Sequence, residues 1–291
     1  MSTSPRIAMQ GVCKQFAGPT AQVLGQQVLQ DVALTLEKGE FVCLLGASGC
    51  GKTTVLHLLA GFEQADQGTL LIDGQPIAGP GPDRGMVFQQ PTLFPWLSVL
   101  DNVTFGPRMA GQSQAAVTGQ AMHFLRMVGL QNHVHHFPWQ LSGGMRQRAA
   151  LARAWLPGPE ILLMDEPFGA LDAQTRLAMQ ELLTGLWQTT GTTILFVTHD
   201  VDEALYLADR VLIMASAPGR IRTERKVPFV RPRSVEDLVA DPAYGVLKRD
   251  ILHIVREESA KSLPAAIFPS PPSPSPAGRG ERPESASRLA Q

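Results

Sequence analysis

One short stretch of the sequence has the residue types and the spacing that bind a phosphate chain. It consists of Gly46, Ala47, Ser48, Gly49, Cys50, Gly51, Lys52 and Thr53, which fit the pattern GxxxxGK[ST]. Its glycines let the backbone wrap around an anion with the N–H groups pointing inward. Lys52 would supply a charge to the β and γ phosphates, and the Thr53 hydroxyl would bind Mg²⁺. The alternative is a Gly-rich turn without a ligand.

The elements around this loop favour the phosphate site. An apolar run at residues 41–45 precedes it and predicts a buried strand. Thr54, Leu56 and Leu59 follow it with helical spacing, so the positive end of a helix would face the phosphates. The sequence therefore predicts an ATP site here. Cys50 lies inside the loop near that helix, where the pKa of a thiol tends to fall, so we expect reagents to alkylate it and ATP to protect it.

Polar residues follow two further apolar runs. Asp165 and Glu166 come after residues 161–164, at a strand end where α/β sheets place ligands. Asp165 would hold Mg²⁺ through water, and Glu166 would polarise the attacking water as general base. His199 follows residues 193–197 and would contact the γ-phosphate and orient Glu166. The alternatives are a solvated carboxylate pair that caps a strand and a structural histidine.

A second anion site is predicted far along the chain from the first. Ser142 is a suitable cap for a helix, and Gly143 and Gly144 would let a phosphate approach the backbone at the start of that helix. Taken alone, this segment would favour an ordinary capped helix start.

The elements that position these residues follow from the apolar patterns. Runs that are apolar at every position, at residues 41–45, 161–164, 193–197 and 211–214, predict strands of a mostly parallel α/β sheet with helices on both faces. Residues 113–154 have helical periodicity and predict a helical insertion between two halves of that sheet. Residues 237–258 are periodic again, and the Pro/Ser-rich residues 263–291 are expected to be disordered.

The composition excludes other classes of protein. Lys and Arg number 25 and Asp and Glu 26, so the formal net charge is −1 and no basic footprint for nucleic acid exists. The three cysteines have no metal or disulfide spacing, which fits a reducing cytoplasm. No apolar run approaches the roughly 18 residues that a membrane span needs, so a membrane role would require a partner.

Several motifs in one fixed order resemble the ATP-binding subunits of ABC transporters. Residues 46–53 look like their Walker A motif, residues 141–148 (LSGGMRQR) like their signature and residues 161–166 like Walker B. Gln89 matches the Q-loop glutamine, Asp172 the D-loop, His199 the switch histidine and Phe16 the aromatic residue that stacks on adenine. The resemblance covers about residues 6–230. Phe16 departs from it, because many relatives carry Tyr there.

The resemblance implies a fold and a set of roles. The fold is a P-loop NTPase cassette, with a RecA-like core, a mixed sheet and a helical subdomain at about residues 91–156. The ATP-binding domain would span residues 6–232, followed by a helical extension at residues 233–262. Glu166, His199, Gln89 and Lys52 would be catalytic, Thr53, Gln89 and Asp165 would bind the metal, and ATP and Mg²⁺ would be the ligands.

A finer resemblance concerns the transported solute. Segments at residues 79–85, 94–99, 101–103, 165–172 and 216–220 look like those of importers of nitrate, sulfonates and taurine. The taurine and aliphatic sulfonate branch is the preferred interpretation. Nitrate, nitrite, cyanate or another small nutrient is the alternative, and a soluble ABC ATPase is a further one.

The family also implies partners. Two copies would face each other head to tail, with ATP between the phosphate loop of one and Ser142–Gly144 of the other. A permease and an external solute-binding protein would complete an importer, and this subunit would lie on the cytoplasmic face of the bacterial inner membrane. Residues 91–96 are the candidate permease contact; equally, they would pack inside the helical insertion.

Overall fold

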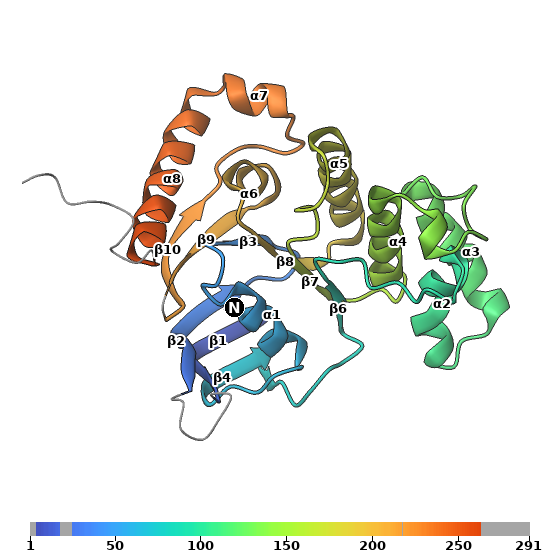
Figure 1. The fold of residues 1–291 in the computed structure, drawn as a ribbon, viewed down its shortest axis with the longest axis horizontal. Coiled ribbons are helices and arrows are strands. Elements are labelled where there is room, and N and C mark those ends of the chain that lie inside the picture. Colours follow the sequence, from blue (N-terminus) through green and yellow to red (C-terminus); the bar gives the residue numbers. More distant parts are fainter. Residues whose placement is uncertain (1–3, 18–24, 217, 263–291) are drawn as a thin grey trace, which may run out of the picture.

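The computed structural model describes residues 4–17, 25–216 and 218–262. Its centre is a six-stranded sheet in the order β10-β9-β3-β8-β7-β6 (Figure 1). The strands are β3 (Phe41–Leu45), β6 (Arg84–Val87), β7 (Ile161–Asp165), β8 (Thr193–Thr198), β9 (Arg210–Ala215) and β10 (Arg220–Lys226). Only β10 runs antiparallel to its neighbour. The predicted mostly parallel sheet is therefore confirmed.

The continuous apolar runs are explained by burial on both faces of this sheet. In β3, Phe41, Cys43 and Leu45 pack in one hydrophobic cluster, and Val42 and Leu44 pack in another on the opposite face. Strands β7 and β8 divide their residues in the same alternating way. Because successive side chains point to opposite faces, a strand covered on both sides is apolar at successive positions, and the polar residues of β7 and β8 are confined to their ends.

One face of the sheet is covered by helices from the second half of the chain. These are α5 (Ala173–Thr190), α6 (Val201–Leu207), α7 (Val235–Ala240) and α8 (Pro242–Ser262). Helices α7 and α8 contain the periodic segment predicted after residue 237, and Pro242 begins the second of them. The tail at residues 263–291 lies outside the described residues. Every helix within the described ranges is too short or too polar to cross a bilayer.

The opposite face is covered by helix α1 (Lys52–Ala60) and a second sheet. This antiparallel sheet has the order β2-β1-β4-β5, with strands β1 (Ile7–Phe16), β2 (Gln26–Leu36), β4 (Gln67–Ile72) and β5 (Gln75–Pro76). The apolar pattern did not reveal it, because register shifts between Met9 and Val12 interrupt the alternation of β1.

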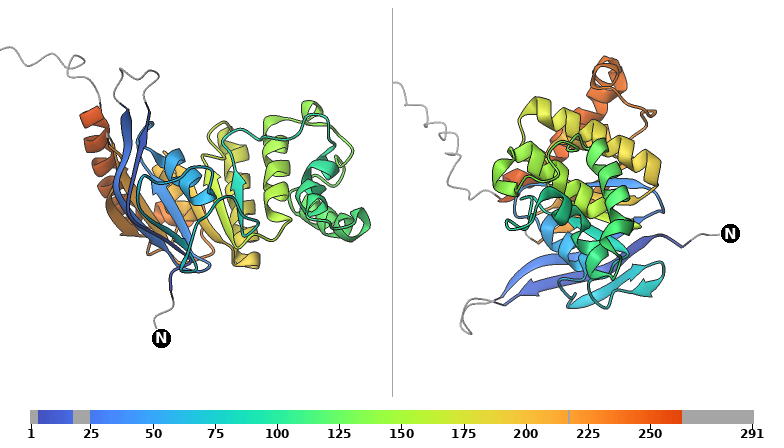
Figure 2. Two further views of the ribbon diagram at one scale, coloured as in Figure 1. Left: turned by 90° about the horizontal axis from the view of Figure 1, so that it is seen from below. Right: turned by 90° about the vertical axis from the view of Figure 1, so that its right-hand side faces the viewer.

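A helical lobe extends from the β6–β7 edge of the six-stranded sheet (Figures 1 and 2). It contains α2 (Val99–Met109), α3 (Gln114–Met127), a 3₁₀ turn at Pro138–Gln140 and α4 (Gly143–Trp155). The predicted α3 face is buried in the lobe's own core, with Ala121, Leu125 and Val128 nearly inaccessible. The lobe therefore has a hydrophobic cluster of its own.

Candidate functional site

The phosphate loop connects β3 to α1, at the carboxyl edge of the parallel strands. Gly51 precedes the helix in a left-handed conformation with φ 98°. A Cβ atom at this position would come within 2.6 Å of Leu29 Cδ2, so both the conformation and the space require glycine. The backbone N–H groups of the first turn of α1 are thereby left facing the loop, which is the arrangement that binds anions.

Lys52 is held inside the loop. Its side chain is 5% exposed, and its ammonium group donates hydrogen bonds to the carbonyls of Gly46 and Ala47 at 2.9 and 3.0 Å. The same nitrogen lies 3.5 Å from Glu166 Oε1. The loop therefore fixes the position of a buried positive charge.

Thr53 and Asp165 meet across the site. The Thr53 hydroxyl donates to Asp165 Oδ2 at 2.9 Å, which joins the start of α1 to the end of β7. Burial raises the pKa of the Asp165 carboxyl, and the hydrogen bond from Thr53 partly opposes that rise. Hydroxyl and carboxylate oxygens are the ligands that Mg²⁺ prefers, so this pair fits the predicted cation.

Glu166 and His199 form the second pair of the site. His199 Nδ1 lies 2.9 Å from Glu166 Oε2, although the two residues follow different strands. Glu166 has a positive φ of 41°, and its backbone N–H donates to the carbonyl of Val197 at 3.0 Å. A left-handed conformation is costly for a residue other than glycine, and here it follows directly after strand β7.

A cavity of about 280 Å³ opens in front of the loop. Loop residues and Thr54 line it together with Gln89, Asp165, Glu166 and Val28. The structure therefore brings one glutamine, two carboxylates and the loop lysine to one space. Val28 was not predicted, because it belongs to the other sheet and an apolar residue in a strand gives no signal of a site.

Other predicted residues do not line this cavity. Phe16 ends β1 with 38% of its surface exposed, and the Lys14 ammonium lies 5.1 Å from its ring centre. Ser142 caps α4 by accepting a hydrogen bond from Met145 N at 3.2 Å, in the helical lobe. Asp172 caps α5 by accepting a hydrogen bond from Thr175 N at 3.0 Å. Gly143 is exposed, and a Cβ atom added to it would meet no atom within 4 Å.

The expectation of a reactive Cys50 thiol is wrong. The side chain is 1% exposed and belongs to the hydrophobic cluster below the loop. Burial raises the pKa of the Cys50 thiol, and this effect outweighs the opposing influence of the Lys52 charge. Helix N-termini lower a thiol pKa only where the thiolate can be solvated or paired, and here the sulfur faces the core.

The motif at residues 216–220 has a packing role. Gly219 N donates to Val28 O at 2.8 Å, and Gln30 N donates to Gly219 O at 2.9 Å. A Cβ atom on Gly219 would lie 2.1 Å from the Cys50 carbonyl. The turn between β9 and β10 therefore supports the phosphate loop from behind, and only glycine allows that approach.

Comparison with known proteins agrees with this geometry. The ABC transporter family model matches residues 29–169. The taurine import ATP-binding protein TauB of Pseudomonas aeruginosa is 48% identical over 229 residues, which cover 77% of this chain and 87% of that protein. The nitrate import ATP-binding protein NrtD of Synechococcus elongatus is 46% identical over 230 residues, or 77% and 83% of the two chains.

Solved structures show the same fold. The dimeric structure of MJ0796, a bacterial ABC transporter cassette, matches with a TM-score of 0.68 and 32% identity, covering 77% of this chain and all of that one. Its post-hydrolysis state with ADP and phosphate matches with a TM-score of 0.67. The chain therefore belongs to the ATP-binding subunits of ABC transporters, in the nitrate, sulfonate and taurine branch, and it is an ATPase.

Proposed function

We propose that this chain hydrolyses ATP to drive the import of taurine or an aliphatic sulfonate through a membrane permease. The main support for ATP hydrolysis at this site is the pairing of Thr53 with Asp165 and of Glu166 with His199 around the phosphate loop. Lys52 and the loop N–H groups would bind the phosphates of ATP. The relatives named for taurine import support the solute class.

The roles of the residues follow from their positions. Thr53, Asp165 and Gln89 would hold Mg²⁺, which would neutralise charge on the phosphates when bound. Glu166 would accept a proton from the attacking water, and His199 would orient Glu166 through the 2.9 Å contact. The Lys52 ammonium lies 3.5 Å from Glu166 Oε1, so the loop lysine and the proposed base share one side of the cavity.

The second half of the site would come from another copy of the chain. Ser142, Gly143 and Gly144 form the N-terminus of a 13-residue helix and do not line the cavity of their own chain. In a head-to-tail dimer this helix start would contact ATP held by the partner, with Asp172 nearby and Phe16 against the adenine. The dimeric state of the MJ0796 cassette supports this assembly.

We further propose the division of the chain and its place in the cell. Residues 6–232 would form the ATP-binding domain, with a helical subdomain at about 91–156, and residues 233–262 an extension. The subunit would lie on the cytoplasmic face of the bacterial inner membrane, bound to the permease. Trp96 is 71% exposed whereas Leu93 is 8% exposed, so Trp96 is the better candidate for the permease contact.

Growth of a deletion strain tests the solute class. A strain that lacks this chain should fail to grow on taurine or alkanesulfonates as sole sulfur source, and the intact chain should restore growth. The Glu166→Gln chain is the control, because it should assemble without restoring growth. A strain that grows normally on these sources but loses growth on nitrate as sole nitrogen source would favour the nitrate importer instead.

A further inference from the structure

The position of His199 depends on its backbone, because its ring is largely free. The side chain is 62% exposed, and the contact with Glu166 is the one hydrogen bond of that ring among the described residues. His199 lies between Thr198, the last residue of β8, and Asp200, the cap of α6. Whatever fixes this turn therefore fixes the imidazole relative to Glu166.

The Thr198 side chain closes the turn. Its hydroxyl accepts a hydrogen bond from Asp200 N at 3.0 Å and donates to Glu203 Oε2 at 2.5 Å. Thr198 is 2% exposed and Glu203 is 6% exposed, so both groups are removed from water. A buried hydroxyl has one proton, and the carboxylate that accepts it determines how the hydroxyl is oriented.

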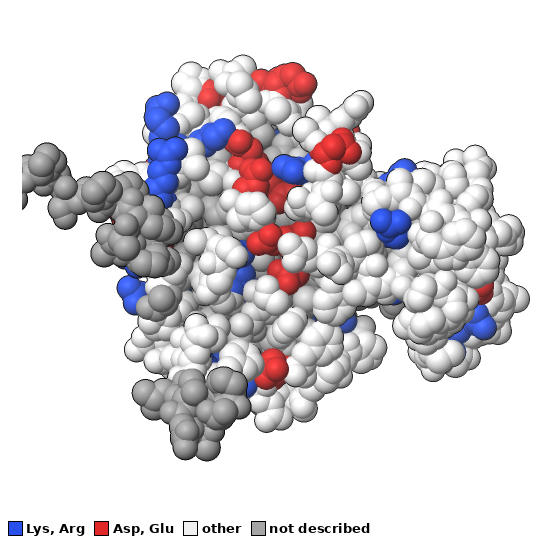
Figure 3. Space-filling model, viewed as in Figure 1, with Lys and Arg blue, Asp and Glu red and all other residues white. Residues whose placement is uncertain are grey.

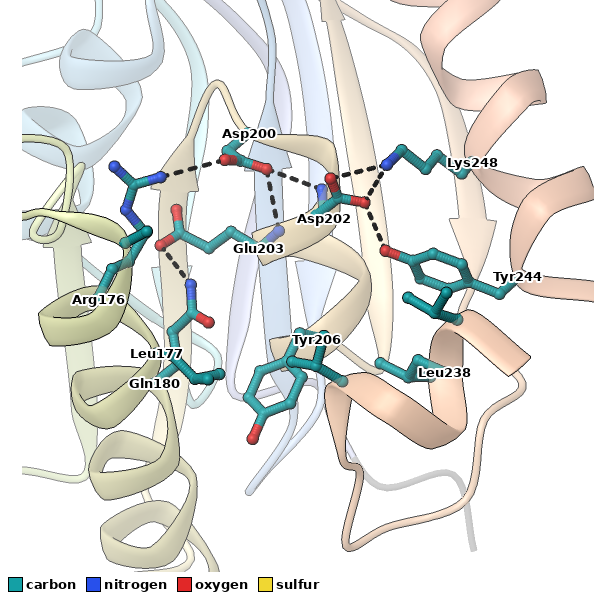
Figure 4. Close-up of a pocket in the computed structure, with 13 residues that line it drawn as sticks. Arg176, Leu177, Gln180, Asp200, Asp202, Glu203, Tyr206, Leu238, Tyr244 and Lys248 are labelled. Carbon is teal, nitrogen blue, oxygen red and sulfur yellow. Dashed lines mark hydrogen bonds and ion pairs between the residues drawn. The ribbon is translucent and has the colours of Figure 1, made fainter. Parts of the chain in front are cut away.

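Glu203 is held in turn by α5. Its Oε1 atom accepts a hydrogen bond from Gln180 Nε2 at 3.1 Å, and Figure 4 shows the two side chains reaching toward each other from α6 and α5. Arg176, one turn earlier on α5, lies 3.5 Å from Asp200 and donates to the Leu171 carbonyl at 3.0 Å. The same helix therefore contacts the turn at His199 and the segment that contains Asp172.

Helix α6 is also fixed from its outer side. Asp202 accepts a hydrogen bond from the Tyr244 hydroxyl at 2.5 Å and pairs with Lys248 at 2.6 Å, both from α8. Acidic side chains gather on this part of the surface, with basic side chains beside them (Figure 3). Glu203 thus projects from a helix that is restrained by its neighbours, which suits a group that must hold another in place.

We infer that Glu203 is a positioning residue for His199: it fixes the Thr198 hydroxyl, which closes the turn that presents the imidazole to Glu166. This inference rests on the proposed role of His199. Burial raises the pKa of the Glu203 carboxyl, and the hydrogen bonds from Thr198 and Gln180 oppose that rise. Glutamine at this position retains both bonds if the Gln180 amide turns over.

The test measures ATP hydrolysis by the full-length chain assembled with its permease. Glu203→Ala should lower kcat by about 100-fold, because small displacements of a catalytic group have effects of that order. The KM for ATP should stay within about twofold, since the phosphate loop is untouched. Glu203→Gln should restore most of kcat. Glu181→Ala, which removes an exposed carboxylate from α5, is the matched control and should behave as the wild type.

A double variant separates positioning from general stability. If Glu203 acts through His199, adding Glu203→Ala to His199→Ala should cause no further loss of kcat. The inference about Glu203 would be overturned if the double variant lost kcat by the product of the two single losses. It would also be overturned if Glu203→Ala kept its kcat while His199→Ala lost it. Neither result would affect the proposed role of His199. Normal activity of His199→Ala would overturn the proposed role of His199 itself.

Thr198 provides a second route to the same answer. If Glu203→Ala does not fold, Thr198→Val should reproduce the loss of kcat, because valine matches threonine in shape but has no hydroxyl to close the turn. Thr198→Ser should recover it. Equal activity of the Val and Ser variants, with thermal unfolding temperatures near that of the wild type, would contradict the inference.

Discussion

The two predicted anion sites of this chain differ in how much of each is built by the chain itself. At the phosphate loop, Lys52 is fixed by two carbonyls, and Thr53 meets Asp165 across the site. At the start of α4, Ser142 makes one cap hydrogen bond and Gly143 is open to solvent. Both have the helix N-terminus that favours an anion, but only the first also has a buried cation and acidic groups around a cavity.

This difference indicates what the phosphate loop and the start of α4 can each do alone. Lys52, Thr53 and Asp165 of the phosphate site all come from one chain, so its affinity for ATP should survive in a single chain. The start of α4 has too few contacts to hold a nucleotide, and it becomes useful when a second copy brings ATP to it. Hydrolysis should therefore depend on both halves, whereas binding should depend mainly on the first.

The largest effect is expected at Glu166. Glu166→Gln should lower hydrolysis by about 10²- to 10⁴-fold, the range for loss of a general base, because an amide cannot accept the proton of the attacking water. ATP binding should remain, since Lys52 and the loop are unchanged. The rate of hydrolysis by the assembled transporter measures the expected loss, and equilibrium binding of ATP measures the expected retention of affinity. Steady hydrolysis by this variant would exclude Glu166 as the base.

A mixture of two defective chains should recover activity. Lys52→Ala disables the loop, and Gly143→Asp should disable the start of α4 by placing a negative charge where a phosphate would approach. An added Cβ at Gly143 meets no atom within 4 Å, and an acidic residue in the first helical turn stabilises the helix, so this variant should fold. In a head-to-tail dimer, one of the two sites of a mixed pair contains neither change.

Each variant alone should be inactive, and an equal mixture should regain up to about a quarter of wild-type hydrolysis, because half of the dimers are mixed and each has one intact site. Gly143→Ala is the uncharged control and should retain more activity than Gly143→Asp. A mixture as inactive as its components would show that the two regions do not meet between chains.

The smallest effect concerns the rates at which Cys50 of the phosphate loop and Cys13 of β1 are alkylated. Burial raises the pKa of Cys50 from its ordinary value of 9.0, so little thiolate exists at neutral pH and iodoacetamide should label Cys13, which is only half-buried, first. Labelling of Cys50 should become faster as the pH rises above 9.0, because the fraction of reactive thiolate increases. Mass spectrometry of the modified peptides measures both rates. Rapid labelling of Cys50 at pH 7 would mean that the loop opens readily.

The sequence by itself determined the parts of this protein whose signals are local. The phosphate loop needs glycine at Gly51 because of its backbone, and the central strands β3, β7 and β8 are apolar along most of their length because both faces are covered. Such requirements leave patterns within a few neighbouring residues. They were sufficient to predict the mostly parallel sheet, and they placed Lys52, Asp165 and Glu166 at strand ends, where the structure has them line one cavity.

Only the tertiary structure decided which side chains meet across elements and which are buried. The position of Cys50 in the loop predicts a lowered thiol pKa. Packing of this side chain against the core raises the pKa instead. The contribution of Val28 and the contact of Gly219 with the loop depend on β2 lying behind it. Likewise, Glu203 reaches Gln180 because α6 packs beside α5, and a contact between two helices of this kind leaves no periodic trace in the sequence.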